Sequence, residues 1–311
     1  MRSLRIILAL ILSGPLLSAL GQRDPLYSQY MFDKLLVNPA YAGSSNWIVG
    51  SLKYRNHLGG IEGAPQTSLF TFHLPLQKKS MGLGVKAVYD QLAVSNSMTL
   101  TGIYSFHIGF GGGKLSFGLE GGMVYNLTDY QSLVRYDPID QSIPETTEAA
   151  IAPDASFGIY YNAKSLYVGV AAYHLFNPKR TVPAYDRNQM FQLEKTFYAL
   201  GGYVIDIGKV FAVEPGFLVC YEPGAPFQVD GFLNFTYAER ITLGGAYRTS
   251  QAAAVMLKVN VTEGLRIAYS YDLNVSNLAN YSSGSHEFML SYGIKLLPPP
   301  ARKEVHPRYY F

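Results

Sequence analysis

The sequence predicts an all-β protein, a transmembrane antiparallel β-barrel of about 14 strands. Apolar and aromatic residues recur at every second position from about residue 47 onward, and a period of two residues indicates strands rather than helices. Several of these runs reach the roughly 9 to 11 residues that a tilted strand needs to cross a bilayer. Only 15% of the residues are charged and 14% are aromatic, whereas about 25% are charged in an ordinary soluble domain.

Composition argues against three other classes of protein. The mean hydropathy of +0.06 is too low for a bundle of membrane helices. The 25 basic residues nearly balance the 22 acidic ones, so the chain has no charge excess suited to nucleic acid. The single cysteine, Cys220, excludes an internal disulfide framework. The fold must therefore be stabilised by hydrogen bonds and packing.

The N-terminus has the pattern of an export signal. Two arginines precede the apolar run 6–20, and residues 19–21 form a small-x-small cleavage pattern. Residues 1–21 are therefore predicted to be a signal peptide. A membrane anchor is the alternative, but Gly14 and Pro15 interrupt the run, which is short for a span of about 20 residues.

Residues 22–46 carry no sustained alternation. We expect this N-terminal segment to run along the periplasmic side or to fold into the lumen as a plug. The alternative is a plain leader to the first strand.

Residues 47–297 are predicted to form the barrel in the outer membrane. Its fourteen strands are expected to begin near Trp47, Thr67, Met81, Ser97, Lys114, Asp154, Leu166, Lys195, Val210, Gln228, Ile241, Ala252, Leu265 and His286. Connections after even-numbered strands are short and rich in turn residues, whereas the long connections 128–153, 174–194 and 272–285 follow odd-numbered strands. The short turns are thus predicted to be periplasmic and the long loops extracellular. A soluble sandwich would also alternate, but its strands are shorter, commonly about 5 to 6 residues.

Charged residues within the predicted strands share one register, opposite the apolar one. They are Lys86, Glu120, Glu214, Asp230, Arg248, Lys258, Arg266, Glu287 and Lys295. These side chains would be costly on a lipid-facing surface, so they are expected to face the lumen, as is Cys220. Their mixed signs favour a lumen cross-linked by ion pairs, or occupied by a peptide or plug, over a pore selective for one sign. An open channel is the alternative.

Three consecutive prolines, beginning at Pro298, end the last strand because proline removes a hydrogen-bond donor. Residues 298–311 are therefore predicted to be a periplasmic C-terminal tail.

No catalytic, cofactor-binding or metal-binding pattern emerges from the sequence. The six histidines are dispersed and none has the spacing of a metal-binding pair. The glycines at 109–113 lack a following Lys-Ser or Lys-Thr pair and predict a hairpin rather than a phosphate loop. Acidic residues in 128–153 lack the spacing of a calcium loop. We therefore expect no enzymatic activity and no cofactor.

Several sequence blocks are similar to motifs of the PorP/SprF family, which belongs to the type IX secretion system of Bacteroidetes. The blocks are DPLYSQYMF (24–32), NPAYAGS (38–44), YRNH (54–57) with EGAPQT (62–67), and SHEFMLSY (285–292). The resemblance extends from Asp24 to about Lys295. His57 stands where the family usually has glutamine, and the proline-rich tail also departs from the family pattern.

The resemblance implies an outer-membrane β-barrel of the secretion and gliding machinery. It implies contacts with outer-membrane lipid and with protein partners, either periplasmic lipoprotein ring components or a secreted adhesin or its C-terminal sorting domain. The family has no known catalytic residues. Matching positions carry over as candidate partner-contact or structural residues: Tyr27, Gln29, Tyr30, Asn38, Pro39, Tyr41, Gly43, Arg55, Asn56, Gly63 and Pro65. Alternatively, each of them only shapes the approach to the first strand and its loop.

A noncatalytic secretion component is thus the function that the sequence favours. The alternative is an outer-membrane channel or a transporter of hydrophobic solutes, since fourteen strands can enclose a lumen.

Overall fold

The computed structural model describes residues 25, 27–76, 80–132, 146–177, 179–181, 190–249, 252–274 and 282–296. The predicted signal peptide (1–21) and C-terminal tail (298–311) lie outside the described residues.

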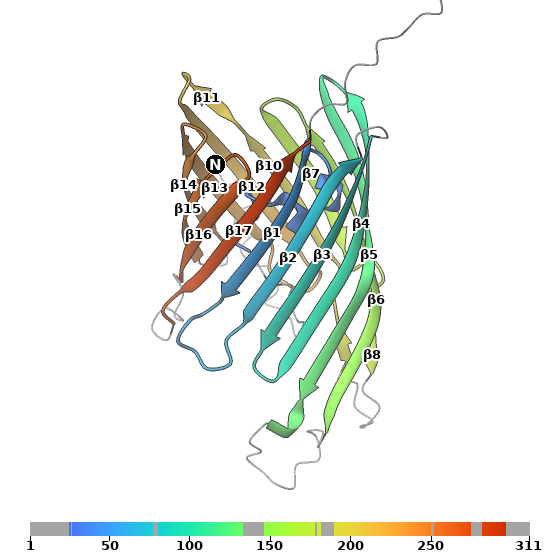
Figure 1. Cartoon of the computed structure of the whole chain (residues 1–311). Helices are drawn as coiled ribbons and strands as arrows, with labels where there is room; N and C mark the ends of the chain where they lie inside the picture. The colour runs from blue at the N-terminus through green and yellow to red at the C-terminus, as the bar shows by residue number, and fades with distance from the viewer. Residues whose placement is uncertain are drawn as a thin grey trace, which may run out of the picture.

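Fifteen of the seventeen described strands form one closed antiparallel sheet, which confirms the predicted 14-strand barrel (Figure 1). The strands are β1 (Trp47–Asn56), β2 (Gln66–Leu76), β3 (Met81–Leu92), β4 (Ser95–Phe110), β5 (Gly113–Asp129), β6 (Thr147–Asn162), β7 (Leu166–Tyr173), β10 (Thr196–Tyr203), β11 (Ile205–Ile207), β12 (Phe211–Tyr221), β13 (Gln228–Tyr237), β14 (Ile241–Arg248), β15 (Ala252–Asn260), β16 (Leu265–Asn274) and β17 (Ser285–Lys295). Pairing of β1 with β17 joins the first and last strands, and β7 pairs with β10. Elements β10 and β11 pair with β12 in one continuous register and count as a single strand.

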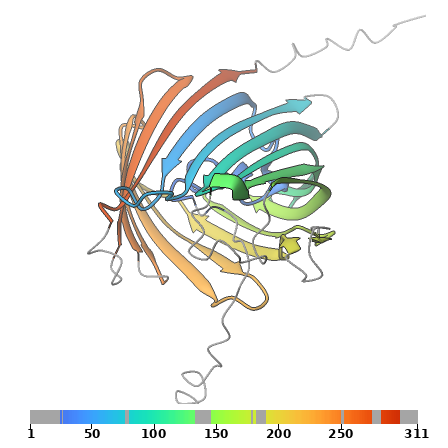
Figure 2. The same cartoon turned by 90° about the horizontal axis from the view of Figure 1, so that it is seen from below.

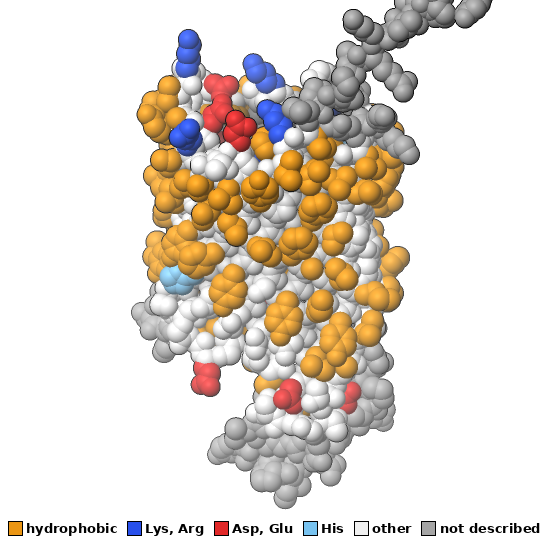
Figure 3. Space-filling view, in the orientation of Figure 1, with side chains coloured by type: hydrophobic (Ala, Val, Ile, Leu, Met, Phe, Trp, Pro, Cys, Tyr) orange, Lys and Arg blue, Asp and Glu red, His pale blue; other side chains and the backbone are white. Residues whose placement is uncertain are grey.

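The two faces of the sheet differ as the alternation predicts. On β5, Leu119 and Met123 point outward and are 58% and 59% exposed, whereas Glu120 and Asn126 point inward and are buried. Apolar side chains cover the middle of the visible outer face, and charged side chains lie at its two ends (Figure 3). Such an apolar band flanked by polar rims is the surface that a bilayer requires.

Five of the nine charges predicted to face the lumen form ion pairs among the described residues: Lys86, Glu120, Asp230, Arg248 and Glu287. Lys86 Nζ lies 2.7 Å from Glu120 Oε1, and Arg248 Nε lies 2.8 Å from Asp230 Oδ2. Cys220 is also buried on the inner face. Pairing the charges offsets much of the cost of removing them from water.

Strand β6 begins at Thr147, earlier than the start near Asp154 that the sequence predicts. The prediction was wrong because Pro153, which cannot donate a ladder hydrogen bond, reads as part of a loop. In the structure Pro153 pairs with Met123 of β5, whereas the described pairing of β6 with β7 begins only at Phe157. Pro153 thus lies on a stretch that pairs through one side, where proline is tolerated.

The connection after β7 contains a short hairpin that the sequence analysis did not predict. Its strands are β8 (Lys179–Thr181) and β9 (Met190–Gln192). Three-residue strands are too short to produce a readable alternation.

The two ends of the barrel differ in their connections. The turn end carries short connections such as residues 111–112 and 163–165, and the loop end carries the longer ones, such as 57–65 and 275–284. In outer-membrane barrels short turns face the periplasm and long loops face outward. Among the described residues, no helix is long and apolar enough to span a membrane.

Residues 27–46, which we call the lumenal segment, lie inside the ring of strands (Figure 2). The segment contains two short 3-10 helices, η1 (Lys34–Leu36) and η2 (Pro39–Tyr41). Gln29, Leu35 and Asn38 are fully buried. The core of the protein is therefore formed between this segment and the inner face of the sheet.

Candidate functional site

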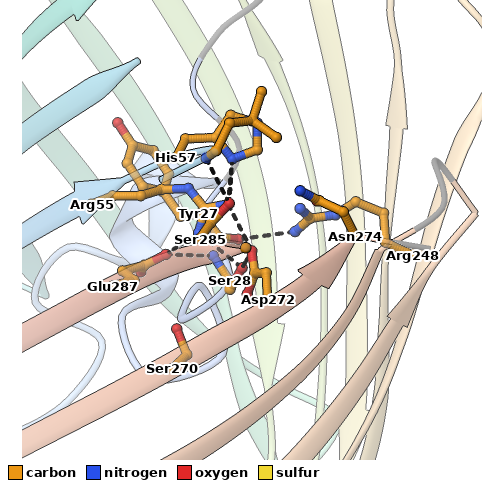
Figure 4. Close-up of polar contacts among 12 residues, drawn as sticks. Tyr27, Ser28, Arg55, His57, Arg248, Ser270, Asp272, Asn274, Ser285 and Glu287 are labelled. Atoms are coloured by element: carbon orange, nitrogen blue, oxygen red, sulfur yellow. Dashed lines mark hydrogen bonds and ion pairs between the residues drawn. The ribbon is translucent and has the colours of Figure 1, made fainter. Parts of the chain in front are cut away.

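The lumenal segment is held at the loop end by a buried ion-pair cluster of Ser28, Arg55, Asp272 and Glu287 (Figure 4). Arg55 on β1 places Nη2 2.7 Å from Asp272 Oδ2 of β16 and Nη1 2.9 Å from Glu287 Oε2 of β17. The Ser28 hydroxyl donates to Asp272 Oδ2 at 2.6 Å, and the Ser28 N–H donates to Glu287 Oε2 at 2.8 Å. One arginine thus neutralises two carboxylates that also bind the segment.

Gln29 adds three hydrogen bonds to the same strands. Its N–H donates to Glu287 Oε1 at 3.2 Å, and its Nε2 donates to Ser270 Oγ and to the Glu287 carbonyl at 3.2 and 2.8 Å. The Tyr27 carbonyl accepts a hydrogen bond from Arg248 Nη2 at 3.5 Å. The Tyr30 ring packs edge-on against Phe232, with centroids 5.8 Å apart.

His57 extends the cluster into the loop that follows β1. Its Nδ1 lies 3.3 Å from Arg55 Nη2 and 2.8 Å from Ser285 Oγ. Because the guanidinium can only donate, Nδ1 must accept, so the imidazole is neutral with its proton on Nε2. Burial, reinforced by the charge of Arg55, lowers the pKa of His57 to about 4. His57 therefore carries no charge at neutral pH.

A second ion pair fixes the middle of the segment. Asp33 Oδ2 lies 3.5 Å from Lys53 Nζ of β1 and accepts a hydrogen bond from Thr71 Oγ1 of β2 at 2.8 Å. All three side chains are buried. The adjacent Lys34 ammonium lies 4.2 Å from the centre of the Tyr167 ring, a distance suited to a cation–π contact.

Asn38 ties η2 to strands β6 and β7. Its Nδ2 donates to the carbonyls of Ile159 and Val170 at 2.9 and 3.2 Å, and its Oδ1 accepts from the Ala40 N–H at 2.9 Å. Pro39 follows as the first helical residue, where its missing N–H costs nothing. One side chain thus caps the helix and bridges two strands of the wall.

Glycines in the wall allow this close approach. A Cβ atom on Gly118 would clash with the backbone of Pro39 and Ala40, and one on Gly169 would lie 2.6 Å from Asn38 Nδ2. A side chain at either position would push the lumenal segment off the sheet.

Tyr41 and Gly43 seat the segment toward the turn end. The Tyr41 ring contacts His73 and Tyr160 edge-on, with centroids 5.5 and 5.6 Å away. The Gly43 N–H donates to His73 Nδ1 at 3.3 Å, and its φ of +64° favours glycine. A Cβ atom there would lie 2.6 Å from the Gly82 Cα of β3.

The remaining candidates lie at the loop end, outside the lumenal segment's contacts. Asn56 ends β1, opposite Gln66 and His286. Gly63 has a φ of +73°, and its carbonyl accepts from the Ala93 N–H at 2.9 Å. The Pro65 carbonyl accepts from the His57 N–H at 2.9 Å. These contacts shape the loop between β1 and β2.

Eight of the eleven candidates thus belong to one assembly: Tyr27, Gln29, Tyr30, Asn38, Pro39, Tyr41, Gly43 and Arg55. The sequence did not indicate that Arg55 pairs with Glu287, nor that it also pairs with Asp272. The position of Asp272 on the inward register of β16 was the available signal. Within the described part of the chain, no group of three His, Cys, Asp or Glu residues could hold a metal ion.

Replacing Asn38 with alanine is expected to lower the free energy of unfolding by about 2–3 kcal/mol, because three hydrogen bonds of a fully buried side chain are lost and two carbonyls of the wall lose a donor. Urea unfolding of the detergent-solubilised protein would measure this change. Asn96→Ala is the matched control, since among the described residues the Asn96 side chain has one hydrogen bond, which it accepts from the exposed Tyr89 hydroxyl. Equal changes for the two variants would contradict the bridging role of Asn38.

The closed sheet and its apolar outer band define the chain as an outer-membrane β-barrel. The Ralstonia pickettii toluene transporter TbuX has a similar structure, with a TM-score of 0.51, 9% identity and coverage of 91% of this chain and 98% of TbuX. The CymD monoaromatic hydrocarbon channel has a TM-score of 0.50, with 11% identity and coverage of 90% and 96%. At these identities the likeness shows the fold alone. The comparison with curated proteins found no match.

Residues 19–292 match the family described as type IX secretion system membrane protein PorP/SprF. The chain therefore belongs to the PorP/SprF family, as the resemblance predicted.

Proposed function

We propose that this protein is a noncatalytic component of the type IX secretion machinery that binds protein partners instead of passing solutes. Membership in the PorP/SprF family supports the secretion context. The observation that carries the proposal is the lumenal segment, which is bound inside the barrel by the buried Asp33–Lys53 ion pair and by hydrogen bonds from Ser28, Gln29 and Asn38 to the wall. A lumen filled in this way is suited to a docking platform, because an open pore would have to lose these contacts.

The proposed partners are periplasmic lipoprotein ring components, or a secreted adhesin or its C-terminal sorting domain. The turn end would meet the first kind of partner and the loop end the second kind. Both ends carry charged side chains beyond the apolar band (Figure 3), which is the composition of surfaces that contact water and protein.

Deletion of the gene is expected to abolish export or surface display of at least one secreted protein, measured by mass spectrometry of the secreted and surface fractions. The full chain carrying an affinity tag should restore display and retain secretion proteins after detergent extraction. A tagged barrel of another family, expressed in the same host, is the control for unspecific capture. Normal export and display in the deletion strain would contradict the proposal.

An outer-membrane channel or hydrophobic-solute transporter is the second candidate. Apolar side chains of Leu36, Val37 and Leu69 line a cavity at the loop side of the lumenal segment, and this observation favours the second candidate. Steady conductance of the purified protein in planar bilayers, or uptake of an apolar solute into proteoliposomes, would support it against the docking platform.

A further inference from the structure

A cavity of about 150 Å³ lies in the lumen, between the lumenal segment and the loop end of the barrel. Leu36 and Val37 of the lumenal segment line it, as do Asp90 and Ser95 at the loop ends of β3 and β4. Its volume corresponds to that of about five molecules of liquid water. The cavity therefore suits a small amphipathic molecule or one long side chain.

Part of the cavity wall is apolar and aromatic. Tyr173 and Tyr198 line it and pack edge-on, with ring centroids 5.5 Å apart. The Lys86 ammonium lies 4.6 Å from the centre of the Tyr173 ring. This wall thus offers hydrocarbon contact and already accommodates one cation on an aromatic face.

The charged groups around the cavity are unbalanced. Four carboxylates line it, those of Asp90, Glu120, Asp154 and Asp230, whereas the basic lining residues are Lys86, Arg248 and the histidine His174. Asp230 pairs with Arg248, and Glu120 pairs with Lys86. Among the described lining residues, the four carboxylates outnumber the three basic groups even when the imidazole is protonated, and this excess of negative charge favours a cationic ligand.

Two lining carboxylates also have spare acceptor capacity. Glu120 Oε1 binds Thr101 and Lys86, and Asp154 Oδ2 lies 2.6 Å from His174 Nδ1. Among the described residues, Glu120 Oε2 and Asp154 Oδ1 have no protein hydrogen-bond partner, although these side chains are only 3% and 5% exposed. A buried acceptor without a donor is costly, so a ligand that supplies N–H groups is favoured.

Strand register places the two carboxylates near one hollow. Thr101, Gly122 and Asp154 lie in one cross-strand row of β4, β5 and β6. Gly122 contributes no side chain to this row, and Glu120 is two residues away on the same face of β5. Glu120 and Asp154 therefore line the cavity from two neighbouring strands.

We propose that this cavity binds an organic cation, an ammonium or guanidinium group carried on an apolar stem. The head group lies among Glu120, Asp154 and the hydroxyls of β4, and the stem packs against Leu36, Val37 and the tyrosine wall. Two sources share this chemistry, a free small amine or guanidine and a lysine or arginine side chain of a bound peptide. The inference goes beyond the role in secretion and does not depend on it.

Ligand-observed NMR titrations of the full chain in detergent micelles test the proposal, with empty micelles as the blank. The probes are butylammonium and butylguanidinium, compared with the isosteric butanol and butanoate. We expect both cations to bind at least about tenfold more tightly than the neutral and anionic probes, because charge-assisted hydrogen bonds contribute about 1.5 to 3 kcal/mol. Butanol binding as tightly as butylammonium would overturn the proposal, as would no binding of either cation.

Two variants locate the site by independent means. Asp154→Asn removes a charge, and Ser97→Tyr fills the cavity from the half-buried β4 side while keeping every carboxylate. Each is expected to weaken cation binding at least about tenfold, whereas Glu62→Gln, at an exposed loop carboxylate, should leave it unchanged. Retention of heat-modifiable migration in gels checks folding. Undiminished binding in folded Asp154→Asn and Ser97→Tyr proteins would overturn the assignment.

Short acetylated peptides distinguish the two sources. A peptide ending in lysine or arginine is compared with the same peptide ending in norleucine or citrulline. Cation-dependent peptide binding that Asp154→Asn weakens identifies a basic side chain as the ligand, and binding of the free cations alone identifies a small molecule. Because these titrations use purified protein, their outcome is separate from export and display in the deletion strain.

Discussion

Replacing Arg55 with leucine is expected to lower the free energy of unfolding by about 3–5 kcal/mol, since removing one partner of a buried ion pair leaves uncompensated charge. Here two carboxylates, Asp272 and Glu287, would lose their cation at once. Both are almost fully buried, so water cannot replace the guanidinium without opening the lumen. Urea unfolding in detergent micelles, followed by tyrosine and tryptophan fluorescence, measures the change.

The control for Arg55→Leu is Arg240→Leu, at an exposed turn residue, which should change the free energy of unfolding by less than about 0.5 kcal/mol. Arg55→Lys should recover only part of the loss, because lysine cannot bind two carboxylates through a planar fork. A small effect of Arg55→Leu, similar to that of Arg240→Leu, would show that the cluster does not hold the lumenal segment.

Replacing Gly118 with leucine is expected to displace the lumenal segment from the wall. The added side chain would occupy the position of the Pro39 and Ala40 backbone, and overpacking of this kind costs typically about 1–3 kcal/mol or more. We expect the purified variant to unfold at lower urea concentration and to conduct ions in planar bilayers, where the wild-type protein stays closed.

Gly121→Leu is the matched control on the same strand. Gly121 faces outward, and a Cβ atom there meets nothing within 4 Å. Its leucine would lie in the apolar band and should leave stability and conductance close to those of the wild type. Conductance of both variants, or of neither, would contradict the idea that contact between Gly118 and the lumenal segment keeps the lumen closed.

Most of the barrel could be predicted because its physical cause is local. Side chains alternate along a strand because one side faces the membrane and the other a polar lumen. The polarity of Leu119 and Glu120 alone therefore predicts that the first points outward and the second inward. The start of β6 was missed because the cost of Pro153 depends on whether β7 reaches that level. How far β7 extends alongside β6 cannot be predicted from the residues around Pro153.

The path of the lumenal segment could not be derived from the residues in the same way. Its contacts join Ser28 to Glu287 and Asn38 to Val170, across 259 and 132 positions of the chain. Contacts between residues so far apart in the sequence produce no periodic pattern from which they could be predicted. Inward charge on Glu287 and glycine at Gly118 were visible in the sequence, but the sequence did not reveal which groups they face.

The ion-pair cluster of Ser28, Arg55, Asp272 and Glu287 has a consequence for assembly of the barrel. Arg55 lies on the first strand and Glu287 on the last, and these two strands close the ring. The cluster can therefore form only after the whole chain has been made and its ends have met, and contacts of such long range form late because loop closure must come first. An unclosed sheet would leave Ser28 and Gln29 of the lumenal segment without their partners on β16 and β17. Binding of Ser28 and Gln29 therefore requires that β1 has already paired with β17. Once formed, these contacts oppose separation of the two strands.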